Sequence, residues 1–243
     1  MDSLFRFKRF SLHNEKSALK LGTDAVLLGA AMTLKPEDRL ALDIGTGTGI
    51  IALMAAQRAP QLHIEAIDID GPSAGEAALN FSESPWSDRL HAVHRPLSEY
   101  AAPGRFDLIF SNPPYYDNSL RNPDERVSAA RHSGSLTLAQ IFSYASEWLG
   151  EGGRLSLILP ADVRISSLRA AASFGFRPFR TVFVKTTPAK EPKRIISEFS
   201  REQLVESQET IILMTDGARS QQYSLLTREF YLDSSQIGQF CHK

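Results

Sequence analysis

The 243-residue sequence predicts one α/β domain, built on a mostly parallel sheet with helices on both faces. From residue 39 onward, short apolar runs alternate with longer amphipathic runs, which is the pattern of repeated strand–helix–strand units. A glycine-rich turn follows the first of these strands, and parallel sheets bind ligands at such turns. The last two strands have no helix between them long enough to cross over. We therefore expect an antiparallel hairpin at one edge.

Apolar runs mark the expected strands, which lie at residues 39–45, 63–69, 89–94, 105–111, 154–160, 177–187 and 209–216. Amphipathic runs mark the expected helices, at residues 49–59, 72–80, 136–149 and 164–174. The sheet should therefore have seven strands, with the last one antiparallel. Residues 1–34 join a basic stretch to an apolar helix and should cover the sheet, with residues 35–243 forming the core. The polar segment 115–135 is long enough to be a functional or disordered loop.

The composition excludes several classes of protein. Hydrophobic residues make up 42% and charged residues 23%, as in ordinary soluble domains, and the formal net charge is −1. Apolar runs fall far short of the roughly 20 residues that span a bilayer, and residues 1–10 do not resemble a signal peptide. The single cysteine, Cys241, cannot form an internal disulfide. We expect a cytoplasmic monomer without a membrane partner.

No metal site is expected either. The six histidines and one cysteine lack the spacing of zinc ligands. His91 and His94 lie three residues apart in one expected strand and therefore face opposite sides of the sheet.

The stretch "LDIGTGTG" at residues 42–49 is the first indication of a ligand. Gly45, Gly47 and Gly49 permit tight turning and close approach of a ligand to the backbone. Their spacing, G-x-G-x-G, differs from the G-x-G-x-x-G that binds a dinucleotide pyrophosphate. Asp43 would repel a pyrophosphate, but its carboxylate can accept hydrogen bonds from an ammonium group. The turn therefore favours S-adenosylmethionine over a dinucleotide.

Two acids end the next strand, in "AIDID". An acid about 20 residues after such a glycine turn usually binds the hydroxyls of a ribose. We assign that role to Asp68, and the alternative, Asp70, is expected to cap the following helix.

The stretch "SNPPYYDN" at residues 111–118 follows the fourth expected strand. With the glycine turn, it resembles the Rossmann-like class I methyltransferases that methylate exocyclic or amide nitrogens. The resemblance implies that the side-chain oxygen of Asn112 and the carbonyl of Pro113 accept hydrogen bonds from the target NH2 group. It also implies that Tyr115 stacks on the flat acceptor, while Pro113 and Pro114 stiffen the turn.

A narrower resemblance rests on five stretches of the sequence taken together, "FRFKRFSL", "LKLGTDAVLLGA", "LDIGTGTGIIALM", "SNPPYY" and "KEPKRIISEF". Together they are similar to the bacterial tRNA adenine-N6 methyltransferases, which modify the adenosine just 3′ of the anticodon in a valine tRNA. One position departs from related enzymes, because Pro96 stands where an acid commonly binds the cofactor adenine. Backbone groups around Leu97 would then bind the adenine in place of that acid. The resemblance implies that Lys20, Gly22 and Thr23 line the cofactor pocket. The other predicted cofactor-binding residues are Asp43, Gly45, Thr46, Gly47, Gly49, Asp68, Ile69, Leu97 and Asn112.

Two locally basic segments, 6–20 and 177–201, are predicted to grip tRNA phosphates. The alternative is that they are solvated surface loops. The predicted RNA-binding residues are Arg9, Lys16, Lys190, Lys193 and Arg194, the last three projecting from a loop between the two edge strands.

Three other functions remain open from the sequence. A protein glutamine fits the same turn, because its amide is planar, and so does an amino group of rRNA or DNA. A nucleotide-binding regulatory module without catalysis is the alternative outside the enzymes, and the intact "NPPY" disfavours it.

Overall fold

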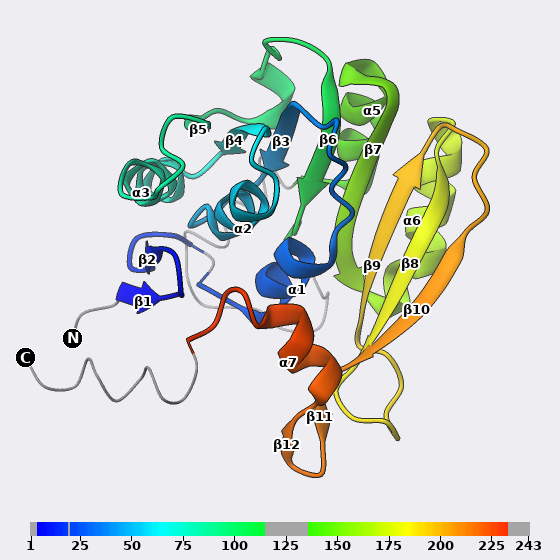
Figure 1. Cartoon of the computed structure of the whole chain (residues 1–243). Coiled ribbons are helices and arrows are strands. Elements are labelled where there is room, and N and C mark those ends of the chain that lie inside the picture. The colour runs from blue at the N-terminus through cyan, green and yellow to red at the C-terminus, as the bar shows by residue number, and fades with distance from the viewer. Residues whose placement is uncertain (1–3, 19, 115–135, 233–243) are drawn as a thin grey trace, which may run out of the picture.

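An eight-stranded sheet forms the centre of the computed structural model, which describes residues 4–18, 20–114 and 136–232 (Figure 1). The strand order is β10-β8-β9-β7-β6-β3-β4-β5. The strands are β3 (Leu40–Ile44), β4 (His63–Asp68), β5 (Leu90–His94), β6 (Phe106–Ser111), β7 (Leu149–Pro160), β8 (Arg177–Lys185), β9 (Arg194–Ser200) and β10 (Ser207–Ile212).

All neighbouring strands in this sheet run parallel except where β9 is involved. Strand β9 pairs antiparallel with β7 on one side and with β8 on the other. The mostly parallel α/β architecture is therefore confirmed, but the expected hairpin is wrong. The strands predicted at 177–187 and 209–216 correspond to β8 and β10, and these two pair parallel.

Strand β9 escaped the sequence prediction because it carries polar residues in a buried position. Glu198 is 0% exposed in the middle of β9. Its carboxylate accepts hydrogen bonds from the hydroxyls of Thr33 and Ser156 at 2.9 Å and from Arg180 at 2.6 Å. These partners offset the cost of burying a charge, and none of them is adjacent to Glu198 in the sequence.

Helices cover both faces of the sheet, as predicted. Apolar residues of α1 (Thr23–Ala31), α2 (Ile50–Arg58), α3 (Gly71–Ser82) and α7 (Gln221–Thr227) belong to one buried cluster. Residues of α5 (Leu138–Trp148) and α6 (Arg164–Ser173) belong to a second cluster, and Figure 1 shows these two helices beside β6–β10. Within the described residues, every helix is too short or too polar to cross a membrane.

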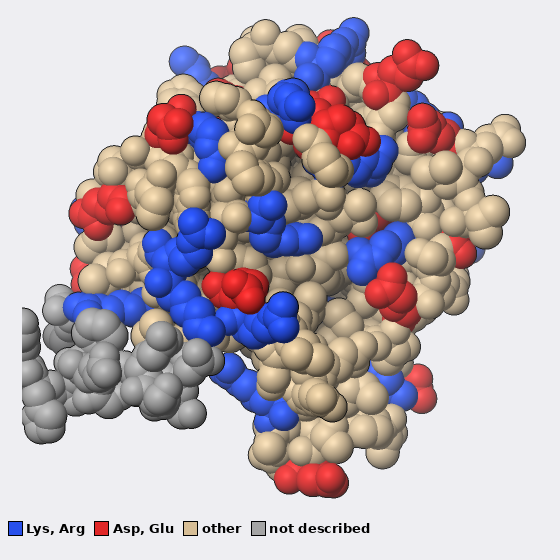
Figure 2. All heavy atoms as spheres, viewed as in Figure 1, with Lys and Arg blue, Asp and Glu red and all other residues tan. Residues whose placement is uncertain are grey.

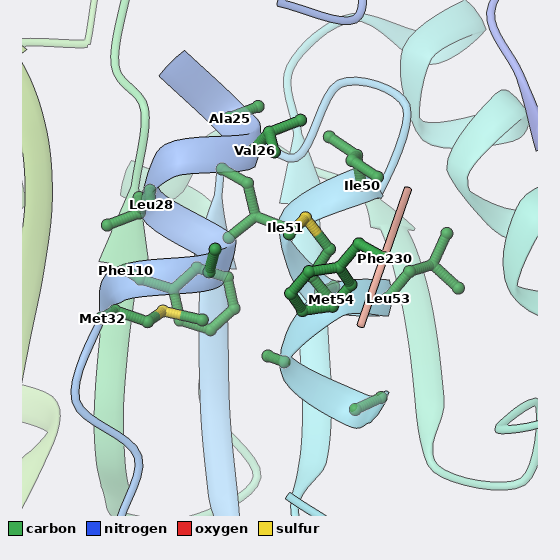
Figure 3. Close-up of a cluster of buried hydrophobic side chains, with 14 of the residues drawn as sticks. Ala25, Val26, Leu28, Met32, Ile50, Ile51, Leu53, Met54, Phe110 and Phe230 are labelled. Carbon is green, nitrogen blue, oxygen red and sulfur yellow. The ribbon is translucent and has the colours of Figure 1, made fainter. Parts of the chain in front are cut away.

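Close contact between α1 and α2 consolidates the first cluster, as Figure 3 shows. A Cβ on Gly29 would lie 2.8 Å from the sulfur of Met54, so the absence of a side chain lets the two helices approach. Phe110 of β6 and Phe230, which follows α7, lie beside the same helices. The segment that precedes β3 and the segment that follows α7 therefore share one core.

The N-terminal residues form a small hairpin of β1 (Leu4–Arg6) and β2 (Ser11–His13). Phe7 lies between its two strands and stacks on Phe10 and Tyr231 with ring centroids 4.6 and 5.8 Å apart. A second small hairpin, β11 (Met214–Thr215) with β12 (Ala218–Arg219), precedes α7. The two ends of the described chain therefore meet at one side of the molecule (Figure 1).

Candidate functional site

Three groups of predicted site residues lie at the carboxyl ends of β4, β3 and β6. In the sheet register, Ile44 lies opposite both Ile67 and Ser111. The residues that come next, Asp68, Gly45 and Asn112, therefore leave three neighbouring strands at the same level. This is the edge at which parallel α/β sheets bind ligands.

Glycines are required in the turn after β3 by its backbone conformation. Gly45, Gly47 and Gly49 have φ values of +70°, +58° and +82°, in a region that other L-residues adopt only at a cost. The amides of Gly45 and Thr46 both donate to the carbonyl of Ile67, at 2.9 and 3.0 Å. The turn is thus bonded to the end of β4.

Gly45 and Gly49 differ in what surrounds them. A Cβ on Gly49 would lie 2.5 Å from the ring of Phe81 on α3, so this glycine serves packing as well as backbone conformation. A Cβ on Gly45 would meet no described atom within 4 Å. Space therefore remains beside Gly45, where a ligand can approach the backbone.

Asp43 is 0% exposed, one residue before the end of β3. Its Oδ2 accepts a hydrogen bond from the Thr46 hydroxyl at 2.7 Å, whereas its Oδ1 has no hydrogen-bond partner among the described residues. Burial raises the pKa of Asp43 to about 7, against the lowering effect of Thr46 and with a further rise from the charge of Asp68. A buried carboxylate with one oxygen unpaired is suited to a cationic ligand.

Asp68 and Asp70 lie in different surroundings, and Asp70 has the capping role that its position predicts. Asp68 Oδ2 accepts the amide of Gly47 at 2.9 Å, and Oδ1 accepts the amide of Asp70 at 2.8 Å. Burial raises the pKa of Asp68, while these two amides lower it. Asp70 caps α3, accepting the amide of Ser73 at 3.0 Å. Asp68 is therefore the acid held beside the glycine turn.

The turn after β6 is fixed to β3 by Ser111. Its buried hydroxyl donates to the carbonyl of Ile44 at 2.7 Å. Asn112 and Pro114 are partly exposed, and Pro113 is buried. Tyr115 lies outside the described residues. Ser111 could not be identified from the sequence, because a serine at a strand end has no distinguishing spacing.

The N-terminal candidates lie where the chain approaches α1. Lys20 donates from Nζ to the carbonyl of Glu15 at 2.6 Å, so its ammonium folds back on its own segment. Gly22 occupies the N-cap position of α1, and Thr23 is the first helical residue. Upstream of them, the backbone of residues 13–18 is hydrogen bonded to side chains of α3, which the sequence did not reveal.

Ile69 and Leu97, the remaining cofactor candidates, lie after β4 and β5. Ile69 is 49% exposed, an unusual environment for a large apolar side chain at a strand end. Its carbonyl lies 3.0 Å from Nε2 of His94, the last residue of β5. Leu97 begins a short 3₁₀ helix, Leu97–Glu99, after Pro96. No metal-ligand cluster of three or more His, Cys, Asp or Glu occurs in the part of the chain that the structure describes.

The basic candidates fall into two places. Arg9 lies over the ring of Trp86 at 5.7 Å, and Lys16 is exposed on the segment bound to α3. Lys190 and Lys193 are exposed between β8 and β9. On the face shown in Figure 2, many Lys and Arg side chains gather around the β1–β2 hairpin, α1 and α2, with a few acids among them.

Arg194 does not project from a loop as predicted, because it is the first residue of β9. Its Nε donates to Oδ2 of Asp24 in the first turn of α1, at 2.7 Å. The long-range pairing of α1 with β9, which the sequence alone does not show, gives this cation a partner within the protein.

Comparisons with known proteins find relatives along almost the whole chain. Residues 16–182 match the family model of the methyltransferase small domain. The chain is 40% identical to the tRNA1(Val) (adenine(37)-N6)-methyltransferase of Bacteroides thetaiotaomicron, over 94% of this chain and 97% of the relative. It is 41% identical to the protein of the same name from Porphyromonas gingivalis, over 96% and 97%.

A solved structure gives the same fold at low sequence identity. The chain superposes on a protein described as a predicted O-methyltransferase from Agrobacterium tumefaciens with a TM-score of 0.68. The match has 18% identity and covers 85% of this chain and 96% of that one. At this identity the likeness concerns the fold alone.

Proposed function

The chain belongs to the family of tRNA1(Val) (adenine(37)-N6)-methyltransferases, and we propose that it methylates the exocyclic N6 of an adenosine in tRNA. The proposed nucleotide is the one just 3′ of the anticodon of a valine tRNA, for which the relatives are named. The observation that carries the proposal is the row of Asp68, Gly45 and Asn112 at one sheet edge. It brings the predicted cofactor-binding residues next to the predicted acceptor-binding turn.

S-adenosylmethionine, when bound, supplies an electrophilic methyl group on its sulfonium sulfur. The residues present fit this cofactor. The unpaired Oδ1 of Asp43 is the acceptor offered to the amino acid end of the ligand. Among the described residues, each oxygen of Asp68 accepts one hydrogen bond, from Gly47 and from Asp70, and each oxygen has a further lone pair for a ribose hydroxyl. The open space at Gly45 lies next to Asp68 in the row.

The binding of the adenine nitrogen that receives the methyl group is assigned to Asn112 and Pro113. An aromatic amine is a weak nucleophile, because its lone pair is delocalised into the ring. Two oxygens that accept hydrogen bonds from its NH2 group favour the tetrahedral geometry of the transition state, in which the lone pair is available to attack. Ser111, bonded to Ile44, fixes the start of this turn relative to the glycine turn. Such positioning lowers the entropy cost of bringing the two reactants into line.

No residue is required as a general base before the methyl group is transferred. The neutral adenine amine would form a bond to the methyl carbon while the bond from that carbon to the sulfonium sulfur breaks, leaving a neutral thioether. The resulting nitrogen would carry a positive charge that makes it strongly acidic. Its proton then leaves to solvent.

A base within an anticodon loop must leave its stack before it reaches Asn112. Tyr115 is proposed to replace the lost stacking, which is worth roughly 1–3 kcal/mol per base. Phosphate contacts by Arg9, Lys16, Lys190 and Lys193 are proposed to hold the tRNA backbone nearby. A tRNA substrate also implies that the enzyme acts in the cytoplasm, and we propose that it does so as a monomer.

The competing substrates are less well supported. A protein glutamine or a DNA or rRNA base fits the same planar site, but the relatives that cover almost the whole chain are named for a tRNA. A regulatory module without catalysis would not need the "NPPY" stretch beside the glycine turn.

The deciding experiment incubates the purified protein with labelled S-adenosylmethionine and total tRNA from a strain that lacks the gene, and then analyses the nucleosides. Label in N6-methyladenosine is expected, and sequencing of the modified tRNA identifies the position. Wild-type tRNA is the control, since its site is already methylated. Label confined to protein, with none in any tRNA nucleoside, would refute the proposal.

A further inference from the structure

One face of α3 is both polar and buried. Ser73, Glu76 and Asn80 are spaced three and four residues apart and therefore lie on one side of the helix. Their exposures are 2%, 2% and 1%. A carboxylate buried to this degree is unfavourable unless hydrogen-bond donors satisfy it.

Glu76 receives three backbone amides from one stretch of the N-terminal segment. Its Oε1 accepts from Glu15 at 2.6 Å and from Lys16 at 2.8 Å, and its Oε2 accepts from Ser17 at 2.8 Å. Bonds from neutral amides to a carboxylate are stronger than those between neutral groups. Glu76 thereby fixes the backbone of residues 15–17, which precede Lys20 and Gly22.

Asn80 connects the same segment to the glycine turn. Its Oδ1 accepts the amide of His13 at 2.7 Å, and its Nδ2 donates to the carbonyl of His13 at 3.0 Å. The same Nδ2 donates to the carbonyl of Thr48, between Gly47 and Gly49, at 2.8 Å. One carboxamide therefore bonds both to the segment and to the turn.

Ser73 connects the other end of the segment to the proposed ribose acid. Its hydroxyl accepts the amide of Ala18 at 3.2 Å and donates to Oδ2 of Asp70 at 2.7 Å. The amide of Asp70 in turn donates to Asp68 at 2.8 Å. The segment at residues 13–18 is thus linked to the glycine turn at one end and to Asp68 at the other.

We propose that Glu76 is a positioning residue for cofactor binding, because it sets the N-terminal segment against the glycine turn and thereby places Lys20, Gly22 and Thr23. The proposal rests on the proposed function insofar as the cofactor is S-adenosylmethionine. A carboxylate is needed because the amides of Glu15, Lys16 and Ser17 require an acceptor at both oxygens. A glutamine at position 76 would offer only one acceptor oxygen, and its NH2 group would face a backbone N–H donor of residues 15–17.

The test is E76Q, with E83Q as the matched control. Glu83 contacts the same segment, at Nε2 of His13 over 3.0 Å, but its side chain is 53% exposed and it accepts no amide of residues 15–17 in the described structure. Calorimetry with S-adenosylmethionine and no tRNA should show affinity about tenfold lower for E76Q, as expected for loss of hydrogen bonds to a charged group. The E83Q variant should bind the cofactor like the wild type.

Two further measurements distinguish positioning from general stability. Amide hydrogen exchange should speed up at residues 13–18 in E76Q, while the strands of the central sheet stay protected. In steady-state assays, the KM for S-adenosylmethionine should rise, with the KM for tRNA and the kcat at saturating cofactor retained.

Unchanged cofactor affinity in E76Q would overturn the proposal, whether or not exchange at residues 15–17 increases. If E76Q does not fold, E76D serves instead, because it keeps the carboxylate but shortens its reach to the amides of residues 15–17. Reduced cofactor affinity in E76D supports the proposal, and wild-type affinity overturns it. Because binding and exchange are measured without RNA, failure to methylate tRNA would refute the proposed function without affecting this result.

Discussion

Gly47 donates its backbone amide to Oδ2 of Asp68 over 2.9 Å, so the glycine turn after β3 and the acid at the end of β4 are held together before any ligand binds. The other oxygen of Asp68 accepts a hydrogen bond from the amide of Asp70, which is the N-cap residue of α3. Preorganisation of this kind reduces the ordering that a ligand must bring about.

Asp68→Ala should weaken the binding of S-adenosylmethionine by about 1.5–3 kcal/mol, the range for hydrogen bonds to a charged group. Calorimetry measures the cofactor affinity, and filter binding measures the affinity for tRNA, which should stay the same. Asp70→Ala is the comparison, since it removes the cap of α3 and should lower mainly the free energy of unfolding. Wild-type cofactor affinity in Asp68→Ala would assign the ribose to another residue.

Asp43 makes the stability of the protein without cofactor depend on pH. Its folded-state pKa of about 7 lies above its ordinary value of 3.8, so between these pH values the folded chain holds a proton that the unfolded chain has released. The contribution of Asp43 to stability is therefore fully present below about pH 4 and is lost as the pH rises through about 7. Urea unfolding across this range should show a decline that is smaller in Asp43→Asn.

Cofactor binding should also release a proton from Asp43. An ammonium group next to the carboxylate lowers the pKa of Asp43, so near pH 6 the bound protein carries fewer protons than the free protein. Calorimetry in buffers of different ionisation enthalpy measures this release, and Asp43→Asn should abolish it. If wild type and variant exchange equal numbers of protons, the ligand does not meet Asp43.

Alanine at two glycines of the turn should have different effects. Gly49→Ala combines positive φ with a Cβ 2.5 Å from Phe81, so the free energy of unfolding should fall by about 2–5 kcal/mol. Gly45→Ala meets no described atom and should cost only the backbone strain, about 1–3 kcal/mol, while reducing cofactor affinity. Denaturant unfolding and calorimetry of both variants separate packing from ligand access.

Asn112→Ala should lower turnover by about 10²–10³, the cost of losing one acceptor or donor that acts in a transition state. Affinity for S-adenosylmethionine should change only a few-fold, because Asn112 is proposed to act on the target nitrogen. Single-turnover methylation of tRNA, with calorimetry in parallel, measures both effects. A turnover within tenfold of the wild type would remove Asn112 from this role.

The two kinds of basic residue near β9 can be separated by salt dependence. Replacing Lys190 and Lys193 by Ala should flatten the slope of log affinity for tRNA against log salt by roughly 0.7–0.9 per lost phosphate contact. Arg194→Ala should leave the slope unchanged, because Arg194 already pairs with Asp24. An unchanged slope in the lysine variant would place the phosphate contacts elsewhere, with Arg9 and Lys16 the next to test.

The sequence by itself determined the features that depend on short-range pattern. Alternating apolar and amphipathic runs predicted every strand of the central sheet except β9, and the comparisons confirm the methyltransferase family that the motifs indicated. The spacing of the motifs along the sequence was enough to predict that Asp43, the glycines of the turn after β3 and Asp68 lie at one edge of the sheet. Parallel strands end at the same side of a sheet. Local chemistry was also sufficient to predict that Asp70 caps α3.

Only the tertiary structure decided the features that depend on distant partners. Strand β9 is buried with Glu198 at its centre because Thr33, Ser156 and Arg180 satisfy that carboxylate, and no short window of sequence contains them. Arg194 is an ion-pair partner of α1 and not a loop cation, since β9 brings it beside Asp24. Glu76, an ordinary helix residue by sequence, lies in the interior because the N-terminal segment folds across α3 and supplies three amides. A buried charge is tolerated only where the fold assembles its hydrogen-bond partners, and that assembly is a property of the whole chain.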